Sequence, residues 1–334
     1  MNRGVRALAV MLAAVVLIVA ITAFSWAAIV GSDRMVQPPR SSDCRTPAHL
    51  GIAYEAINYD PATDARFSSE PDPTRCATPT TVELGEELVS ADGVPLAAWY
   101  IPAEEDASDA PTIVFAHGWT GSKSTVIDVL PMVHPRYNAV MFDFRNHGQS
   151  GASPTTQGVR EQHDLAAVVD WVVDRTDSVD IVVWGQSMGG HTAVNVAATD
   201  ERVDALVLDS LHSRLAVPYA LRAEEEYPIG RFGAVAALAG MVGAFVRTGV
   251  NVWSAEPIDA IGRLDDTPVL VIRGELDRTI PAPDTDSLVG AARAAKVDVR
   301  LVTCPGGGHA DLAWTCPDLY RASLLAFLDE VSGD

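Results

Sequence analysis

Short apolar segments alternate with longer helix-forming segments over the last three quarters of the chain, and this alternation constrains the fold more than any other feature. Apolar runs separated by helical segments are typical of a mostly parallel sheet with helices on both faces. We expect strands at 112–118, 138–144, 180–185, 204–210, 268–274 and 296–302. The helices expected around them cover 122–133, 157–175, 188–199, 284–295 and 318–331.

Two more strands and an insertion complete this α/β domain, which we expect to cover 81–334. The stretch TVELGEELVSADGVPLAAWYIP predicts a hairpin that reverses at Asp92 and Gly93, giving a sheet of about eight strands. Residues 211–267 exceed what one crossover helix needs, so they predict a helical cap over the strand ends. The apolar part of the cap is too short to cross a bilayer. It is either a buried helix or a surface that faces the substrate or a membrane.

An apolar segment precedes the domain. Residues 7–30 carry no charge and follow Arg3 and Arg6. This length suffices for a membrane-spanning helix, whereas a cleaved signal peptide has an apolar region of about 7–15 residues. We expect a transmembrane anchor, although the small residues in AFSWAA leave cleavage and secretion open. The two arginines predict that residues 1–6 are cytoplasmic and that the remainder lies outside the cell membrane.

Residues 31–80 are rich in Pro, Ser, Asp and Thr and predict an extracytoplasmic linker. In an oxidising compartment, the four cysteines would form two local disulfides, Cys44 with Cys76 and Cys304 with Cys316. Four buried free thiols are the alternative. The cysteine and histidine spacings do not match a zinc site, and we predict no metal or cofactor. The formal charge of −20 opposes binding to nucleic acid.

The segment VVWGQSMGGH carries a G-x-S-x-G motif between an expected strand and an expected helix. Gly185 and Gly189 flank Ser187, and a β-carbon at either glycine would crowd a tight turn. Such a turn exposes the serine hydroxyl above the sheet, and the helix that starts near Met188 directs N–H groups toward it. Ser187 is therefore the candidate nucleophile.

A serine nucleophile needs a base and an acid to orient that base. Asp277 follows the expected strand 268–274, and His309 lies in a glycine-rich loop after the next strand. Both should reach the edge of the sheet where Ser187 lies, because the carboxyl ends of parallel strands share one edge. Asp209 also ends a strand and is the alternative acid. The N–H groups of Trp119 and Met188 are the candidate oxyanion donors.

Five motifs occur in the order HGWTGS, DFRNHGQSG, GQSMGG, GELDRTIP and GGGHA. In these motifs the chain resembles the α/β-hydrolase superfamily, in particular its bacterial serine-hydrolase esterases. The resemblance implies Ser187 as nucleophile, Asp277 as acid, His309 as base, and Trp119 and Met188 as oxyanion donors. It covers about three quarters of the chain and leaves out residues 1–80.

The second motif departs from the family pattern, because Asn146 stands where glycine is usual. We interpret this motif as a structural loop in which Asp143 and Arg145 hold the approach to the site.

These observations predict a membrane-anchored extracytoplasmic serine hydrolase that cleaves small-molecule or lipid-like carboxylic esters through an acyl-enzyme. A peptidase, a thioesterase or an acyltransferase would use the same residues. A non-enzymatic binding protein of the cell envelope is the alternative from another class. A third hypothesis makes the membrane segment the main function, within an envelope complex. The sequence names no protein partner.

Overall fold

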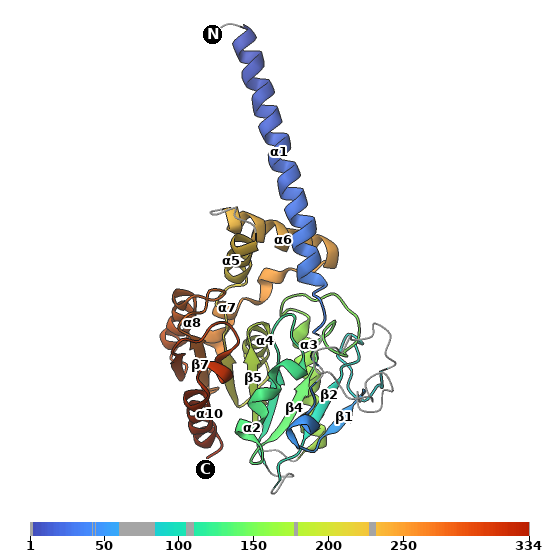
Figure 1. Ribbon diagram of the computed structural model, residues 1–334, viewed down its shortest axis with the longest axis vertical. Helices are drawn as coiled ribbons and strands as arrows, with labels where there is room; N and C mark the ends of the chain where they lie inside the picture. The colour runs from blue at the N-terminus through green and yellow to red at the C-terminus, as the bar shows by residue number, and fades with distance from the viewer. Residues whose placement is uncertain are drawn as a thin grey trace.

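The computed structural model describes residues 3–41, 43, 45–59, 84–104, 110–176, 180–226 and 232–333. Its centre is one eight-stranded sheet in the order β1-β2-β4-β3-β5-β6-β7-β8 (Figure 1). β2 pairs antiparallel with β1 and with β4, and every other pairing is parallel. The expected mostly parallel sheet of about eight strands is therefore confirmed. Its strands are β1 (Glu55–Ile57), β2 (Ala98–Ile101), β3 (Thr112–Ala116), β4 (Asn138–Phe142), β5 (Ile181–Gln186), β6 (Ala205–Asp209), β7 (Val269–Gly274) and β8 (Val299–Cys304).

Successive side chains of each buried strand point to opposite faces of the sheet. Helices cover both of these faces. Val183 of β5 packs on one face with α3 (Glu161–Arg175), α4 (Met188–Ala197) and α8 (Ala282–Ala294). Val182 and Trp184 pack on the other face with the 3-10 helix Lys123–Val129, α2 (Leu130–Val133) and α10 (Pro317–Val331). Four of the five expected helices form as α-helices with boundaries shifted by a few residues, and the first, expected at 122–133, is a 3-10 helix that ends in one α-helical turn.

The expected hairpin forms only in part. The chain reverses at Asp92 and Gly93, and Val89 pairs with Pro95 in an isolated bridge. The sheet partner of β2, however, is β1, which lies inside the segment expected to be a linker. The Asn58 side chain at the end of β1 donates hydrogen bonds to the carbonyl oxygens of Leu88 and Leu96. This long-range pairing replaces the local one that the sequence predicts.

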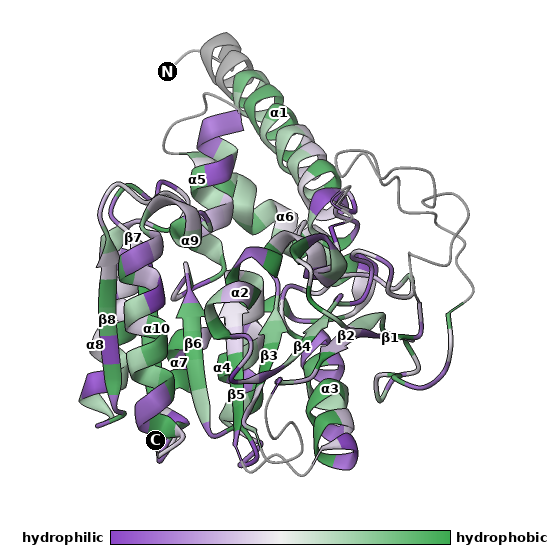
Figure 2. Ribbon diagram, turned by 60° about the horizontal axis from the view of Figure 1, so that its bottom comes forward, coloured by the Kyte–Doolittle hydropathy of each residue, from purple (hydrophilic) through white to green (hydrophobic). Residues whose placement is uncertain are grey.

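The N-terminal helix α1 (Arg3–Val36) projects from the domain as one continuous helix (Figure 1). An 18-residue window within Val10–Val36 has a mean hydropathy of 2.5, and this part of the helix is long and apolar enough to cross a membrane. Figure 2 shows the hydrophobic character of most of this length. The helix continues beyond residue 30, where the sequence predicts the end of the anchor, and its last turns pack against the rest of the chain.

The predicted cap region contains α5 (Ala216–Glu226), α6 (Gly233–Thr248) and α7 (Pro257–Ala260), with 3-10 helices at Val252–Ala255 and Ile261–Arg263. α1 packs against α6 through small residues (Figure 2). A β-carbon on Gly31 would lie 3.0 Å from Cα of Gly240, and one on Gly243 would overlap the carbonyl oxygen of Ala28. Glycines at such a crossing let the two helix backbones approach closely. The cap is thus joined to the N-terminal helix.

Candidate active site

Ser187 lies at a sharp turn between β5 and α4. Its backbone has φ 50° and ψ −111°, in a region that non-glycine residues rarely adopt. Its N–H donates to the carbonyl oxygen of Asp209 at 2.9 Å, and its own carbonyl accepts from the N–H of His191 at 3.0 Å. Backbone strain of this kind costs about 1–3 kcal/mol and persists only where the surrounding structure enforces it. The motif therefore forms the strand, turn and helix that the sequence predicts.

Two glycines make the turn possible. A β-carbon on Gly185 would lie 2.6 Å from Cα of Gly190, and one on Gly189 would overlap the carbonyl oxygen of Ala116 in β3. Both obstacles are backbone atoms and cannot move aside as a flexible side chain would. The close packing of the turn against the neighbouring strand therefore requires glycine at these positions.

We expect Gly189→Ala to lower the free energy of unfolding by about 3 kcal/mol, because the added methyl group forces the turn away from β3. Thermal unfolding of the full chain in detergent, followed by circular dichroism, measures the change. Gly290→Ala is the matched control, since Gly290 is exposed in α8 and a β-carbon there meets no atom within 4 Å. This control should be neutral or stabilising by up to about 1 kcal/mol. Equal melting temperatures for the two variants would contradict the assigned role of Gly189.

The structure brings Asp277 and His309 together. Nδ1 of His309 lies 2.9 Å from Oδ2 of Asp277, whose side chain is 1% exposed. The other oxygen of Asp277 accepts the N–H groups of Thr279 and Ile280, each at 2.8 Å. An ionised carboxylate only accepts hydrogen bonds, so Nδ1 carries the proton and Nε2 has a free lone pair. His309 thus has the tautomer that a general base requires.

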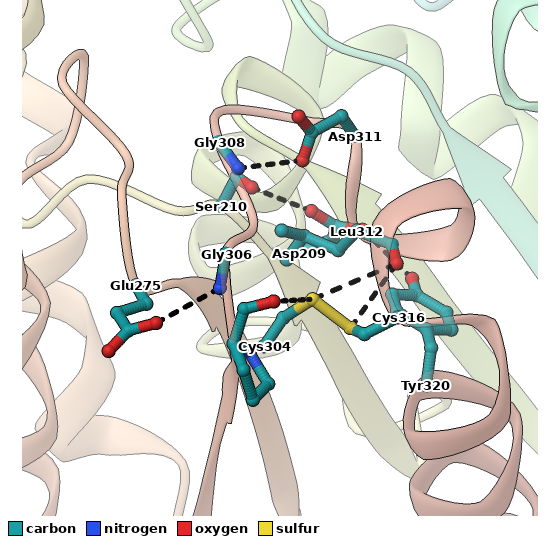
Figure 3. The surroundings of a disulfide bond; sticks show 11 residues. Asp209, Ser210, Glu275, Cys304, Gly306, Gly308, Asp311, Leu312, Cys316 and Tyr320 are labelled. Carbon is teal, nitrogen blue, oxygen red and sulfur yellow. Dashed lines mark hydrogen bonds between the residues drawn. A yellow bond between two sulfur atoms is a disulfide. The ribbon is translucent and has the colours of Figure 1, made fainter.

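Asp209, the alternative acid, faces a different group. It accepts hydrogen bonds from the hydroxyls of Ser210 (2.8 Å) and Tyr320 (2.9 Å), and burial raises its pKa to about 6 (Figure 3). Ser210 Oγ in turn accepts the N–H of Ala310 at 3.0 Å, beside His309. Among the hydrogen bonds of the described residues, Asp209 reaches the histidine loop through Ser210, whereas Asp277 contacts the imidazole directly.

A disulfide between Cys304 and Cys316 closes the loop that carries His309, as the sequence predicts (Figure 3). Cys304 ends β8 and Cys316 precedes α10. Inside the loop, the N–H of Gly308 donates to Asp311 at 2.8 Å, and the N–H of Gly306 donates to Glu275 at 3.0 Å. The second predicted pair, Cys44 with Cys76, lies outside the described residues.

Replacing both Cys304 and Cys316 with serine is expected to lower the free energy of unfolding by about 2–4 kcal/mol, because the unfolded chain then regains the freedom that the closed loop removes. The same change loosens the loop around His309. Thermal unfolding of the full chain, followed by circular dichroism, is the measurement. An unchanged melting temperature would show that the loop is held by its hydrogen bonds alone.

Ser187 and His309 line one cavity of about 340 Å³. Trp119 and Met188, the predicted oxyanion donors, line it too. The same cavity is lined by further side chains that sequence reasoning did not identify, namely Gln157, Gln186, His212, Tyr219 and Arg222. Gln186 lies inside the GQSMGG motif, whereas Gln157, His212, Tyr219 and Arg222 belong to none of the five motifs. The amphipathic pattern of α5 is the only signal that could have pointed to Tyr219 and Arg222.

The peptide of Trp119 is held close to the turn of Ser187. A β-carbon on Gly118 would lie 3.4 Å from Cβ of Ser187, so these two backbones are neighbours. The N–H of Thr120 donates to Nε2 of His147 at 3.3 Å, and burial lowers the pKa of His147 to about 3. A neutral His147 can accept this bond, and it fixes the segment after Gly118. Met188 is the first residue of α4, where helix N–H groups have no intrahelical acceptor.

The DFRNHGQSG loop beside the site is held by buried charges. The Asp143 carboxylate pairs with the Lys123 ammonium, and both side chains are fully buried. Arg145 pairs with Asp164 at 2.6 Å and reaches Asp92 at the same distance. These contacts support the structural role that the sequence predicts for the loop.

Asn146 explains the departure from the family pattern. Its φ is 62°, in the left-handed region that favours glycine and that asparagine tolerates better than most residues. Asn146 can therefore adopt the left-handed backbone conformation that a glycine would adopt here. Among the described residues, no group of three His, Cys, Asp or Glu side chains is arranged to hold a metal ion.

Comparisons with known proteins agree with this geometry. The family model for the alpha/beta hydrolase fold matches residues 111–248. The protein YfhR of Escherichia coli (strain K12) is 28% identical over 251 residues, which cover 72% of this chain and 79% of YfhR. The protein bem46 of Schizosaccharomyces pombe is 25% identical and covers 72% of this chain and 80% of its own length.

Two solved structures show the same architecture. The Pyrococcus furiosus esterase Pf2001 superposes with a TM-score of 0.67 at 21% identity, covering 89% of this chain and 98% of the esterase. Est1E of Butyrivibrio proteoclasticus, solved with ferulic acid, superposes with a TM-score of 0.54 at 19% identity, covering 74% of this chain and 99% of Est1E. The chain thus has the alpha/beta hydrolase fold, and its residues 111–248 match the family model for that fold.

Proposed function

We propose that the protein is a membrane-anchored extracytoplasmic serine hydrolase that cleaves carboxylic esters. The observation that carries this proposal is the arrangement of the cavity: Ser187, on its strained turn, and His309, bonded to Asp277, line the same space. An inert binding protein of the cell envelope would not need a serine, a histidine of the correct tautomer and a buried carboxylate around one cavity.

The reaction follows from these groups. Oγ of Ser187 attacks the ester carbonyl carbon while Nε2 of His309 takes the hydroxyl proton. The N–H groups of Trp119 and Met188 stabilise the oxyanion that forms on the carbonyl oxygen. His309 then gives the proton to the leaving alcohol as the ester C–O bond breaks. Water attacks the acyl-enzyme with His309 again as base, and the acid leaves as Ser187 regains its proton. Asp277 keeps the imidazole oriented throughout.

Two further observations support the finer parts of the proposal. Pf2001, which shares the fold over most of both chains, is named an esterase. The apolar length of α1, Arg3 and Arg6 at its start and the disulfide near His309 fit an anchored enzyme whose domain lies in an oxidising compartment. Peptidase, thioesterase and acyltransferase activities would use the same Ser187 chemistry and differ only in the leaving group or the acceptor.

The test uses the full chain in detergent. A fluorophosphonate probe reacts with an activated serine, and p-nitrophenyl esters from acetate to laurate report hydrolysis. Labelling at Ser187 together with ester turnover would support the proposal. Labelling without turnover would favour a peptidase or a transferase. Absence of both from a folded protein would favour the binding protein, or the envelope complex in which the membrane segment is the main function.

A further inference from the structure

A second cavity, larger than the one around Ser187, lies between the N-terminal helix and the cap. Its volume is about 640 Å³, within the range of about 300–1,000 Å³ that is usual for small-molecule sites. α1, α5 and α6 all contribute to its walls, and most of the side chains that line it are apolar. Representative lining residues are Ala23, Phe24, Ala27, Ala223, Val235 and Ala236. Such walls suit a hydrocarbon chain.

This cavity, here called the acyl chamber, adjoins the cavity around Ser187. Trp119, Tyr219 and Arg222 line both. The rings of Trp119 and Tyr219 meet edge to face at 5.9 Å, and the Arg222 guanidinium lies 5.0 Å from the centre of a Trp119 ring. These three side chains therefore form the boundary between the chamber and the candidate nucleophile. A ligand chain in the chamber would end beside the oxyanion donor Trp119.

The boundary carries polar groups without partners. Nε1 of Trp119 and the hydroxyl of Tyr219 are buried, and neither has a hydrogen-bond partner within the part of the chain that the structure describes. A buried donor that is left unpaired costs about 1–3 kcal/mol. The ester oxygens of a bound substrate would satisfy such donors at the point where the apolar chain meets the reacting bond.

The length of α1 indicates where the chamber would lie if the proposed anchor spans a membrane. A helix of 34 residues is about 51 Å long, whereas a bilayer core is about 30 Å thick and needs about 20 residues. Counted from residue 7, the span ends near Ala27. Ala23, Phe24 and Ala27 thus place one wall of the chamber at the outer side of the hydrocarbon region.

The cap presents an apolar surface at the same end of the molecule. Large apolar side chains on and just before α6 are exposed, namely Phe232, Val235, Leu238, Phe245 and Val246. A cluster of this kind is typical of a protein or membrane contact. Because α6 packs directly on α1, this surface lies beside the anchor and fits the outer face of the bilayer.

The wall formed by α1 is tied to the catalytic domain. The Gln157 side chain, which lines the cavity around Ser187, donates to the carbonyl oxygen of Met35 at 2.7 Å. The N–H of Thr155 donates to the carbonyl oxygen of Val36 at 2.9 Å. These bonds satisfy carbonyls at the end of the helix that would otherwise lack partners. The anchor is therefore fixed in position relative to Ser187.

We propose that the acyl chamber binds the hydrocarbon chain of a long-chain lipid ester that enters from the outer leaflet of the membrane, and that the anchor helix forms one wall of this binding site. This proposal rests on the serine hydrolase activity proposed above and specifies its substrate class. The N-terminal helix then serves in substrate binding as well as in attachment. The scissile ester lies at Trp119, between the chamber and Ser187.

The test introduces a large side chain into the chamber from α6, on the side of the cap. Ala236→Trp places a large side chain in the chamber, whereas Ala234→Trp, two residues away on α6, places the same side chain at an exposed position that does not line it. Each full chain is reconstituted in phosphatidylcholine vesicles, and kcat/KM is measured for p-nitrophenyl laurate and p-nitrophenyl butyrate. We expect Ala236→Trp to lower the ratio of kcat/KM for laurate to kcat/KM for butyrate by about tenfold or more. A loss of this size corresponds to excluding about two methylene groups of the acyl chain from the chamber. Ala234→Trp should leave the ratio unchanged.

The outcomes separate the two proposals. Equal ratios in the two variants, with both labelled by fluorophosphonate, would overturn the role of the chamber and leave the hydrolase assignment intact. A wild-type chain that hydrolyses neither ester and takes no label would overturn the hydrolase assignment and the substrate role with it. If Ala236→Trp does not fold, Ala27→Trp fills the chamber from α1 instead. The same laurate-to-butyrate ratio of kcat/KM then tests the role of the chamber.

Discussion

Replacing Ser187 with alanine is expected to reduce turnover of p-nitrophenyl butyrate by about 10⁴- to 10⁶-fold, because the proposed nucleophile, whose hydroxyl would form the acyl-enzyme, is lost. The cavity, the oxyanion donors and the Asp277–His309 pair remain in place, so slow water attack sets the residual rate. The measurement compares kcat for the wild-type and variant full chains in detergent, together with fluorophosphonate labelling.

Ser287→Ala is the matched control for this variant. Ser287 is exposed on α8, and its hydroxyl donates only to the carbonyl oxygen of Pro283 within its own helix. Its loss should leave both turnover and labelling unchanged. Turnover by Ser187→Ala at a rate comparable to the wild type would refute the role of Ser187 as nucleophile.

Asp277→Asn is expected to lower kcat by about 10⁴-fold, although the change removes no atom from the fold. The asparagine amide can donate a hydrogen bond to Nδ1 of His309, which favours the tautomer with the proton on Nε2. The imidazole then has no lone pair toward Ser187 and cannot act as base. Comparison of kcat for the variant and the wild type, with circular dichroism to confirm folding, measures the effect.

Asp209→Asn is the comparison that identifies the acid. Asparagine still has an oxygen that can accept from Ser210 or Tyr320, and Asp209 does not contact His309 directly. We therefore expect a much smaller loss of kcat than for Asp277→Asn. If Asp209→Asn were the more damaging of the two with the fold intact, the acid would have to be reassigned to Asp209.

The choice between Asp277 and Asp209 as the acid could not be predicted from the sequence and needs the structure. Both Asp209 and Asp277 follow a buried strand, and both should reach the edge of the sheet near Ser187. The spacing along the chain cannot tell which carboxylate meets the imidazole. That choice depends on the path of the loop after β7, in which the N–H groups of Thr279 and Ile280 fix the carboxylate of Asp277 toward His309.

The side chains of the cap that reach the site are even harder to predict from the sequence. The prediction of a cap and of its bounds rests on an overlong connection after β6, which is a local property of the sequence. The side chains that reach the site, Tyr219 and Arg222, are set by the way α5 packs against α6 and the segment around Trp119. Periodicity identifies the apolar face of a helix but not the element that will cover it.

The sequence by itself determined the features that rest on neighbouring residues: the alternating strands and helices, the glycine-flanked turn of Ser187 and the apolar length of the N-terminal helix. Only the tertiary structure decided the pairing of β1 with β2, the contact of Asp277 with His309 and the crossing of α1 over α6. The physical reason is that these contacts join residues far apart in the chain. Close approach of backbones, as between Gly31 and Gly240, and the satisfaction of buried polar groups select them.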